Sequence, residues 1–443
     1  MRLSYSYSHI LKVALPLMLG TFIQSLVMIT DSAFLSRYST LSFDASGNAG
    51  LIYVTLFVGL TGLADSSLIV MARRIGQNIR GAINPVLQSS ILVILVIALL
   101  FFLFIQFGMG DLLMGYSKSK ELAQEQIDFL TIRSYGFFIT IPMLVLNSFF
   151  LANGKTWVIL LSTSTFSIAN VILDYLLIFG FWNIEPMGVK GAALASIISE
   201  GIASLVLIVI LFNSKERFRY QVFYRFHITK EALLGLFRVG FPLMIQGFVA
   251  LSSWTVFFTF IEQMGLYELT VSQNIRFVYF LAFVPIFGFG ATTRTYVAQY
   301  MDAKEITAIP IIIKRIQLLT FLFLLLFFHG ALLYPETLIS LINPDPTYIK
   351  DSAFILRLMF GSILIFGLTV PYFQTINGSG NTRASLAIET IATLTYIIYS
   401  YITIKVLGWS LVSIWTVEYL YFTLLGILSC SYLYFFNWRK KIY

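Results

Sequence analysis

The sequence predicts an all-α polytopic membrane protein whose twelve transmembrane helices form two pseudo-symmetric six-helix lobes. Three observations predict this fold: the composition, twelve apolar segments and an internal repeat. Hydrophobic residues make up 58% of the 443-residue chain and charged residues only 11%, whereas a soluble protein carries roughly 25% charged residues. The mean hydropathy is +0.85. This composition excludes a soluble enzyme, a disordered chain and a nucleic-acid binder.

Twelve apolar segments are each long enough to cross a bilayer, which takes about 20 helical residues. The first segment contains Asp31 and lacks an obvious small-residue cleavage site, so we interpret it as a retained helix, not a signal peptide. In chain order the predicted spans are 10–36, 48–72, 84–108, 126–151, 156–180, 188–212, 233–261, 270–298, 311–334, 352–376, 383–406 and 409–436.

Lys and Arg concentrate in the connections that lie on the same side as the two termini. An even number of spans places both termini on one side of the membrane, and basic residues favour the cytoplasmic side. We therefore expect both termini to be cytoplasmic, in the inner membrane of a bacterium. We expect the protein to act as a monomer.

The two halves of the chain resemble each other at an offset of 226 residues. LPLMLGTF at 15–22 aligns with FPLMIQGF at 241–248, and Gly154-Lys-Thr156 aligns with Gly380-Asn-Thr382. Because each repeat contains an even number of helices, the repeats keep the same topology, as in many secondary transporters. The predicted organisation is an N-terminal lobe over 1–212, a cytoplasmic linker over 213–232 and a C-terminal lobe over 233–443.

The linker interleaves basic and aromatic residues between Lys215 and His227. Such a segment is typical of a chain that lies on anionic membrane lipids. Nucleic-acid binding is the less favoured interpretation.

Proline residues interrupt several of the predicted helices. Pro16 lies about four turns before Asp31 in the first span, and Pro242 holds the equivalent position in the seventh. A kink at Pro16 could couple ion binding to helix bending, although a static packing bend explains it equally well.

Acidic side chains within the spans are the main functional candidates, because a charge at mid-membrane is costly. Asn170 and Asp174 are four residues apart in an otherwise apolar helix, so they share one face. Gln24 and Asp31 are seven apart and also share a face. Carboxylate and carboxamide oxygens converging inside one lobe would bind a hard cation or, equally, a proton.

The repeat supports a role for this set in one half only. The positions 226 residues after Asp31, Asn170 and Asp174 are Phe257, Tyr396 and Ser400. The acids are thus absent from the second half, which suggests that the N-terminal half handles the ion.

Several motifs, in this order, resemble those of the multidrug and toxic compound extrusion (MATE) transporters. They are the early Pro16 followed by Asp31, MARRIGQNIRGA, LANGKTW, ANVILDYLLIFG with GVKGAALAS, and then VGFPLM, AFVPIFGFGATT and INGSGNTR. The resemblance covers essentially the whole chain.

The resemblance implies an antiporter, not an enzyme, that exports small amphipathic and often cationic compounds in exchange for sodium ions or protons. It implies no cofactor beyond this coupling ion. In relatives with an ion site in the N-terminal lobe, the matching positions are Asp31, Asn170 and Asp174, which would also be the only metal site, for sodium. Ser196 matches a contributing hydroxyl on the sixth helix, and Glu200 lies one turn further.

The sequence departs from the NorM-type members of this family. Those members carry acids on the seventh and tenth helices, whereas here both helices lack one, which favours a DinF-like mechanism. Arg276 and Glu389, on the eighth and eleventh helices, could pair or contact substrate.

The sequence fits two other functions less well. A lipid-linked saccharide flippase of the same superfamily would need several cavity arginines, and the chain offers few. An intramembrane enzyme would need a nucleophile and a base, but His329 stands apart from any recognisable catalytic partner.

Overall fold

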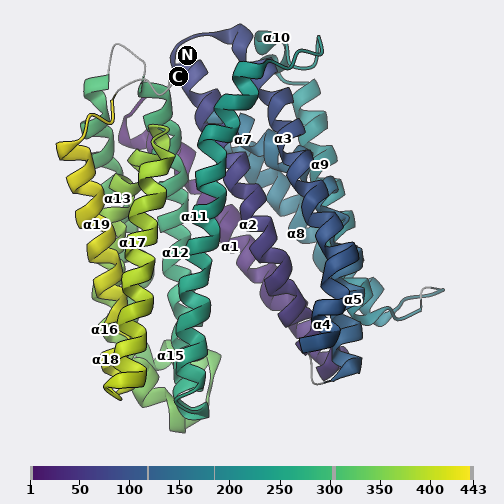
Figure 1. Cartoon of the computed structure of the whole chain (residues 1–443), viewed down its shortest axis with the longest axis vertical. Coiled ribbons are helices and arrows are strands. Elements are labelled where there is room, and N and C mark those ends of the chain that lie inside the picture. Colours follow the sequence, from purple (N-terminus) through teal and green to yellow (C-terminus); the bar gives the residue numbers. More distant parts are fainter. Residues whose placement is uncertain (1–2, 117–118, 184, 302–305, 440–443) are drawn as a thin grey trace. The chain divides into compact units, whose positions relative to one another are not determined.

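The computed structural model describes residues 3–116, 119–183, 185–301 and 306–439, and no β-strand forms among them (Figure 1). The helices of the first half are α1 (Tyr7–Tyr38), α2 (Thr40–Gly76), α3 (Ile83–Phe104), α4 (Gly110–Tyr116), α5 (Lys120–Arg133), α6 (Gly136–Ile139), α7 (Ile141–Ala152), α8 (Thr156–Phe179), α9 (Gly188–Phe212) and α10 (Lys215–Tyr220). Those of the second half are α11 (Lys230–Glu262), α12 (Leu266–Tyr300), α13 (Ile309–Phe328), α14 (Gly330–Leu333), α15 (Pro335–Ile342), α16 (Pro346–Gly378), α17 (Thr382–Tyr401), α18 (Leu411–Ile414) and α19 (Val417–Phe435).

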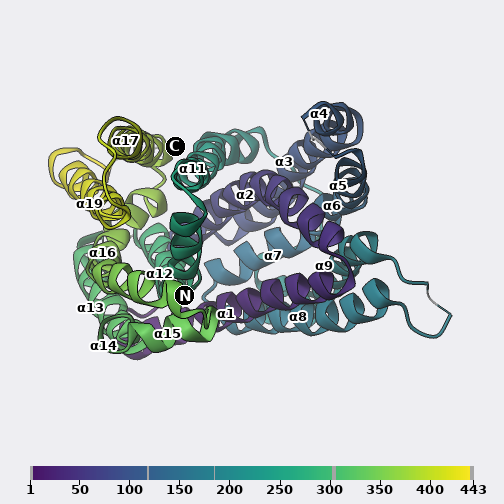
Figure 2. The same ribbon diagram turned by 90° about the horizontal axis from the view of Figure 1, so that it is seen from below.

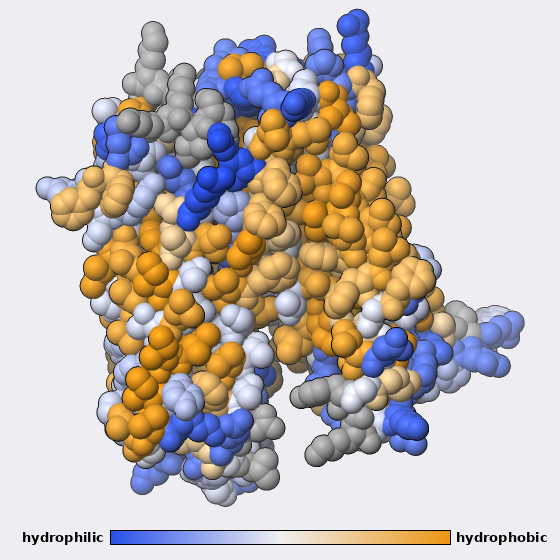
Figure 3. Space-filling view, viewed as in Figure 1, coloured by the Kyte–Doolittle hydropathy of each residue, from blue (hydrophilic) through white to orange (hydrophobic). Residues whose placement is uncertain are grey.

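The prediction of twelve membrane spans is confirmed. Among the described residues, eleven helical segments are long and apolar enough to cross a membrane, and the bent pair Lys120–Ile139 and Ile141–Ala152 supplies a twelfth. The bend between the two parts of this pair is 43°, and Pro142 at the start of the second part removes a backbone donor there. On the face shown in Figure 3, apolar residues cover the sides of the helices and hydrophilic residues gather towards their ends.

The chain divides into two compact units, and the division cuts through two helices. The N-lobe is Leu19–Met244; the C-lobe is Ile245–Tyr443 together with the chain up to Met18. Helix α1 therefore changes lobe two residues after Pro16, and α11 does so two residues after Pro242. The units are thus not simple halves of the chain, because each contains the beginning of the other's first long helix.

A glycine of a neighbouring helix packs against α11 near Met244 and another packs against α1 near Met18, where the two helices pass from one lobe to the other. A Cβ atom on Gly62 of α2 would lie 2.7 Å from the backbone nitrogen of Met244, inside the N-lobe. A Cβ atom on Gly288 of α12 would lie 2.5 Å from Cγ of Met18, inside the C-lobe. The two glycines and the two methionines are each 226 residues apart, so the repeat preserves this close approach of helix to helix.

Residues before α1 are held on the C-lobe by hydrogen bonds from C-lobe side chains to their backbone carbonyl oxygens. Tyr296 and Tyr300 each donate a hydroxyl hydrogen bond of 2.8 Å, to the carbonyl oxygens of Ser4 and Leu3 respectively. Arg315 donates to the carbonyl oxygen of Tyr5 at 2.6 Å. These bonds explain why the start of α1 belongs to the C-lobe.

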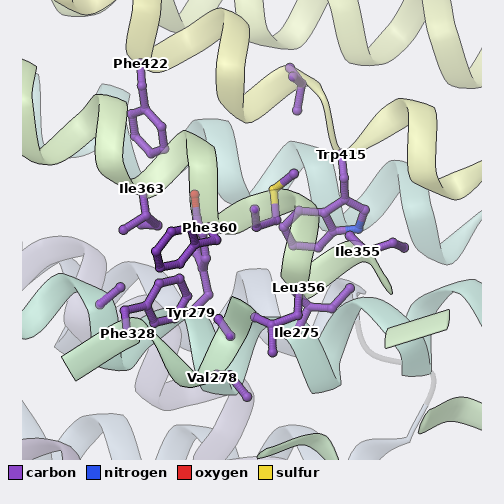
Figure 4. Close-up of a cluster of buried hydrophobic side chains, with 14 of the residues drawn as sticks. Ile275, Val278, Tyr279, Phe328, Ile355, Leu356, Phe360, Ile363, Trp415 and Phe422 are labelled. Carbon is purple, nitrogen blue, oxygen red and sulfur yellow. The ribbon is translucent and has the colours of Figure 1, made fainter. Parts of the chain in front are cut away.

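The C-lobe core is rich in aromatic side chains (Figure 4). Trp415 is fully buried, and its indole nitrogen donates to the hydroxyl of Ser272 at 3.2 Å. The rings of Phe328 and Phe360 stack with centroids 6.1 Å apart. The buried indole N–H of Trp415 therefore has a hydrogen-bond partner inside this core.

The linker is fastened to the N-lobe by two amide side chains of α3. Asn84 and Gln88 donate to the carbonyl oxygen of Arg225 at 3.0 and 2.9 Å. Asn84 also accepts from the backbone nitrogen of Phe223 at 3.0 Å. Contact of this segment with membrane lipids stays a prediction.

Candidate functional site

Two helices of the N-lobe carry the predicted site, and aromatic rings hold them together. Asp31 lies on α1, and Asn170 and Asp174 lie on α8. The ring of Phe34 packs against those of Tyr175 and Phe179, with centroids 6.1 and 5.9 Å apart. Figure 2 shows α1 running alongside α8, with α9 next to it. These rings fix the two helices one turn from the acids.

The two aspartates meet inside the N-lobe. Asp31 is half-buried and Asp174 only 1% exposed, and their side chains lie within hydrogen-bonding reach of each other. Two ionised carboxylates at that separation repel each other strongly in a medium of low dielectric constant. A proton shared between them, or a cation bound by both, removes the repulsion.

The polar atoms of this site have no hydrogen-bond donor among the residues that the structure describes. Both carboxylate oxygens of Asp174, both amide atoms of Asn170 and Oδ1 of Asp31 are buried without one. Asn170 is completely inaccessible, at 0% exposure. Since buried polar groups are nearly always hydrogen-bonded, such a cluster indicates a site that receives its partner from outside the chain.

The N-lobe also contains a buried ion pair. Arg133, at the end of α5, donates to Oε2 of Glu200 on α9 at 2.8 Å, and its second terminal nitrogen bonds Oε1 of the same carboxylate. The guanidinium carbon lies 4.1 Å above the ring centroid of Tyr53 on α2. Arg133 also interacts electrostatically with Asp31.

The ion pair is closely packed around Gly136. A Cβ atom at this position would contact Nη1 of Arg133 and lie 3.0 Å from Oε2 of Glu200 and 3.1 Å from the hydroxyl of Tyr53. Only a glycine fits there. The absence of a side chain at Gly136 leaves the space that the guanidinium occupies when it bonds Glu200.

The remaining predicted residues of the N-lobe lie in different surroundings. Glu200 is bound to Arg133 and is not an open ligand. Ser196, one turn earlier on α9, is half-buried. Gln24 is exposed, two turns before Asp31 on α1.

The C-lobe residues differ from the sequence-based expectation. Arg276 and Glu389, both of which the structure describes, form no ion pair with each other. The guanidinium of Arg276 lies over the ring of Phe258, 4.9 Å from its centroid, and Glu389 accepts a hydrogen bond from the hydroxyl of Tyr421. The expected pairing is therefore wrong; each side chain has an aromatic partner instead.

A second buried acid of the C-lobe was not among the predicted site residues. Glu418 on α19 is 1% exposed and accepts hydrogen bonds from Tyr396 at 2.9 Å and Tyr279 at 3.2 Å. Both of its oxygens are thus satisfied by phenol groups. The sequence shows that Glu418 lies in the last span. It does not show that tyrosines from two other helices donate hydrogen bonds to both oxygens of its carboxylate.

The ion pair was also missed, although the sequence contained a signal. Arg133 stands in the fourth predicted span and Glu200 in the sixth, and opposite charges buried in one lobe usually pair. What the sequence could not show is that α5 and α9 pack together and that Tyr53 lies beneath the guanidinium.

A helical membrane protein with a repeated six-helix lobe and a buried cluster of carboxylate and amide oxygens belongs to the class of secondary transporters. The model of the MatE family matches the chain twice, over residues 16–176 and 242–402. The second match begins and ends 226 residues after the first, which confirms the offset of the repeat. The chain belongs to the MatE family, whose members are transporters and not enzymes.

Sequence relatives cover most of the chain. A protein of Thermotoga maritima described as a probable multidrug resistance protein NorM is 26% identical over 419 residues, which are 90% of this chain and 87% of the relative. A protein of Synechocystis with the same description is 24% identical, covering 88% of this chain and 87% of its own length.

Solved structures share the fold. An outward-facing multidrug resistance MATE transporter of the MOP superfamily superposes with a TM-score of 0.87 at 19% identity, covering 95% of this chain and 93% of its own. A MOP superfamily transporter from Pyrococcus furiosus superposes with a TM-score of 0.86, also at 19% identity, with coverage of 95% and 93%. The resemblance to DinF-type members stays a prediction.

Proposed function

We propose that this protein is a cation-coupled antiporter that exports small amphipathic compounds and takes up sodium ions or protons through the N-lobe site. The observation that carries the proposal is the contact between Asp31 and Asp174 beside the unpartnered amide of Asn170. Relatives described as multidrug resistance proteins support an exporter.

The residues of the site would act by holding and releasing one positive charge. With the site filled, Asp31 and Asp174 share a cation or proton and remain together. With the site empty, their mutual repulsion favours separation of α1 from α8. A ligand that binds one arrangement better than the other shifts the balance between them, which is the coupling that alternating access requires.

The oxygen atoms suit either coupling ion. Two carboxylates and one amide are hard ligands of the kind that alkali and alkaline-earth cations prefer. The same two carboxylates could instead share a proton. We therefore keep both ions in the proposal, at Asp31, Asn170 and Asp174, and add the half-buried Ser196 as a contributing hydroxyl.

The proposed setting is the inner membrane of a bacterium, with both termini in the cytoplasm and the protein acting as a monomer. The concentration of Lys and Arg in the connections on the side of the termini supports this orientation. The partners would be membrane lipids and an amphipathic substrate.

The decisive experiment is efflux of a fluorescent cationic compound from proteoliposomes on which sodium and proton gradients are imposed separately. Asp174→Asn should abolish efflux driven by the effective gradient. Glu418→Gln is the matched control, because it removes an equally buried carboxylate from the C-lobe. Normal ion-driven efflux by the Asp174 variant would contradict the proposed site.

A lipid-linked saccharide flippase is the second candidate. It would need free guanidinium groups to hold a pyrophosphate, whereas Arg133 is bound to Glu200 and Arg276 lies over an aromatic ring. The geometry therefore favours the exporter. Accumulation of lipid-linked oligosaccharide in a deletion strain, without altered sensitivity to toxic cations, would reverse this preference.

A further inference from the structure

We propose that the linker between α9 and α11 is a binding surface for anionic phospholipids. The linker surface consists of three exposed aromatic residues, Phe218, Tyr224 and Phe226, and three exposed basic residues, Lys215, Arg219 and Arg225. The inference deepens the proposed function, which names membrane lipids only as a general partner, and it rests on the proposed cytoplasmic position of the linker.

The backbone of the linker is fixed to the N-lobe at the ends of its helices. Gln88, in the second turn of α3, donates to the carbonyl oxygen of Arg225 at 2.9 Å and accepts from the backbone nitrogen of His227 at 2.6 Å. Tyr220 is only 2% exposed, and its hydroxyl donates to Asn153, just after α7, at 2.9 Å. Figure 1 shows α10 at the ends of the N-lobe helices. The linker surface is therefore held at the boundary of the spanning segments.

The exposed apolar side of α9 leads into this surface. Leu205, Val209 and Phe212 share one face of the helix and are 62, 58 and 43% exposed. In a spanning helix, an exposed face of this kind contacts acyl chains. The guanidinium carbon of Arg217 lies 4.2 Å from the ring centroid of Phe212. A positive charge thus stands where the apolar face ends, which is where headgroups meet acyl chains.

The aromatic side chains of the linker surface are exposed although they lie outside the spanning helices. Phe226 is 85% exposed, Phe218 62% and Tyr224 52%. Rings that faced only water would forgo the free energy gained by removing apolar area from it. Aromatic side chains are enriched at the level of the headgroups, where one side is apolar and the other wet. These three rings therefore indicate contact with the surface of a bilayer.

The basic side chains of the linker surface form no ion pair with any residue that the structure describes. The two acids of the linker, Glu216 and Glu231, are bound instead to Lys155 and Arg74, at 2.6 and 3.0 Å. Nε of Arg217 is buried and has no acceptor among the described residues. The positive charge of the linker is therefore available to an anion from outside the chain.

A phospholipid with a net negative headgroup supplies both features that the surface needs. Its phosphate accepts hydrogen bonds from guanidinium and ammonium groups, and its acyl chains contact the apolar rings. A zwitterionic phospholipid has the same acyl chains but no net charge, so the surface should discriminate between the two. A nucleic acid would supply phosphates and stacking bases, but nothing to cover the apolar face of α9 that continues into the surface.

The test is titration of the purified full-length protein in detergent with phosphatidylglycerol or with phosphatidylcholine of the same acyl chains. Native mass spectrometry counts the bound lipid. The wild type should bind phosphatidylglycerol about tenfold more tightly than phosphatidylcholine. Arg219→Gln combined with Arg225→Gln should reduce this preference to about twofold or less, because two exposed charges are lost. The backbone carbonyl of residue 225, which α3 holds, remains in that variant.

Two further variants locate the effect. Lys350→Gln combined with Lys405→Gln is the matched control, since it removes two exposed charges from the C-lobe and should leave the preference unchanged. Phe226→Ala should weaken the binding of both lipids by about threefold while the preference persists, because the ring contacts acyl chains and not the headgroup charge.

The outcomes are distinct. An unchanged preference in the double variant of Arg219 and Arg225 would overturn the inference, as would an equal loss in the control. A single-stranded oligonucleotide that displaces phosphatidylglycerol from the wild type would also overturn it and assign the surface to a nucleic acid. The titration needs neither an ion gradient nor a transported compound. Its failure would therefore leave the proposed ion site untouched, and failure of the efflux experiment would leave the lipid result unchanged.

Discussion

The two lobes place different chemistry at equivalent positions of the repeat. In the N-lobe, Asp31 and Asp174 contact each other, and their buried oxygens receive no hydrogen bond from a donor in the described part of the chain. In the C-lobe, the positions equivalent to Asp31 and Asn170 are Phe257 and Tyr396, whose rings pack with centroids 5.5 Å apart. The hydroxyl of Tyr396 is directed to Glu418. The N-lobe thus has carboxylate and amide oxygens at positions where the C-lobe has a contact between aromatic rings.

The difference shows that a buried acid is not by itself a functional site. Glu418 and Asp174 are equally inaccessible, at 1% exposure. Glu418 receives two phenol hydrogen bonds from its own lobe, whereas Asp174 receives none from a described donor. What separates them is whether the fold supplies the partner. Each of the following predictions would break or sharpen this contrast.

The largest expected effect is on transport. Asp174→Asn should reduce ion-driven efflux to background, a loss of at least about tenfold, because the amide has no negative charge to balance a bound cation and takes up no proton. Glu418→Gln should leave efflux near the wild-type value. Efflux by reconstituted protein under an imposed gradient measures both, and equal losses would remove the distinction between the lobes.

The next effect concerns the glycines at which α1 and α11 meet the neighbouring helices. Gly62→Ala should destabilise the protein by about 3 kcal/mol, because the new methyl group meets the backbone of Met244, which cannot move aside. Gly288→Ala should cost only about 1 kcal/mol, since the flexible side chain of Met18 is its closest neighbour. Unfolding in detergent, followed by tryptophan fluorescence, compares the two. A larger loss of stability for Gly288→Ala than for Gly62→Ala would contradict this prediction.

A smaller effect should follow from removing one phenol of the C-lobe. Tyr396→Phe leaves Glu418 with Tyr279 alone and should cost about 1 kcal/mol of stability. The ion dependence of efflux should not change. A shift in that dependence would mean that the C-lobe acids take part in coupling.

The smallest effect lies at a helix end outside the membrane. Asp345 precedes α16 and accepts a hydrogen bond from the backbone nitrogen of Thr347 at 2.9 Å, and this bond lowers the pKa of its carboxyl below the usual value. The stabilisation is therefore present above the ordinary carboxyl pKa and is lost as the pH falls through the lowered one. Asp345→Ala should slightly reduce the melting temperature at neutral pH and not in strong acid. Ser39 caps α2 in the N-lobe with a hydroxyl group, which does not titrate in this range. The effect of Ser39→Ala on the melting temperature should therefore not depend on pH.

The fold was predictable because runs of apolar residues identify the spans and similar motifs at a fixed offset identify the repeat. The apolar segments placed every span, and the 226-residue offset appears again in the double family match. The exchange of helix beginnings between lobes was not predictable, because it depends on which neighbours α1 and α11 contact beyond their prolines. Pro16 and Pro242 marked the positions without revealing the exchange.

The candidate site was predictable in its acids and not in its surroundings. Asp31 and Asp174 stand out because they are charged residues in apolar helices. The partner of Glu200 and the phenols around Glu418 come from helices distant in sequence. Composition cannot show which side chain of another helix will satisfy a given carboxylate, and the mistaken pairing of Arg276 with Glu389 arose for this reason.

The exchange of helix beginnings has a consequence for biosynthesis. The N-lobe can be completed only after the ribosome has translated Met244. The C-lobe, in contrast, includes a segment before Leu19 that is translated long before the rest of that lobe. A break in the linker would leave each fragment without part of a long helix. Separately expressed halves should therefore be degraded when alone and accumulate when produced together.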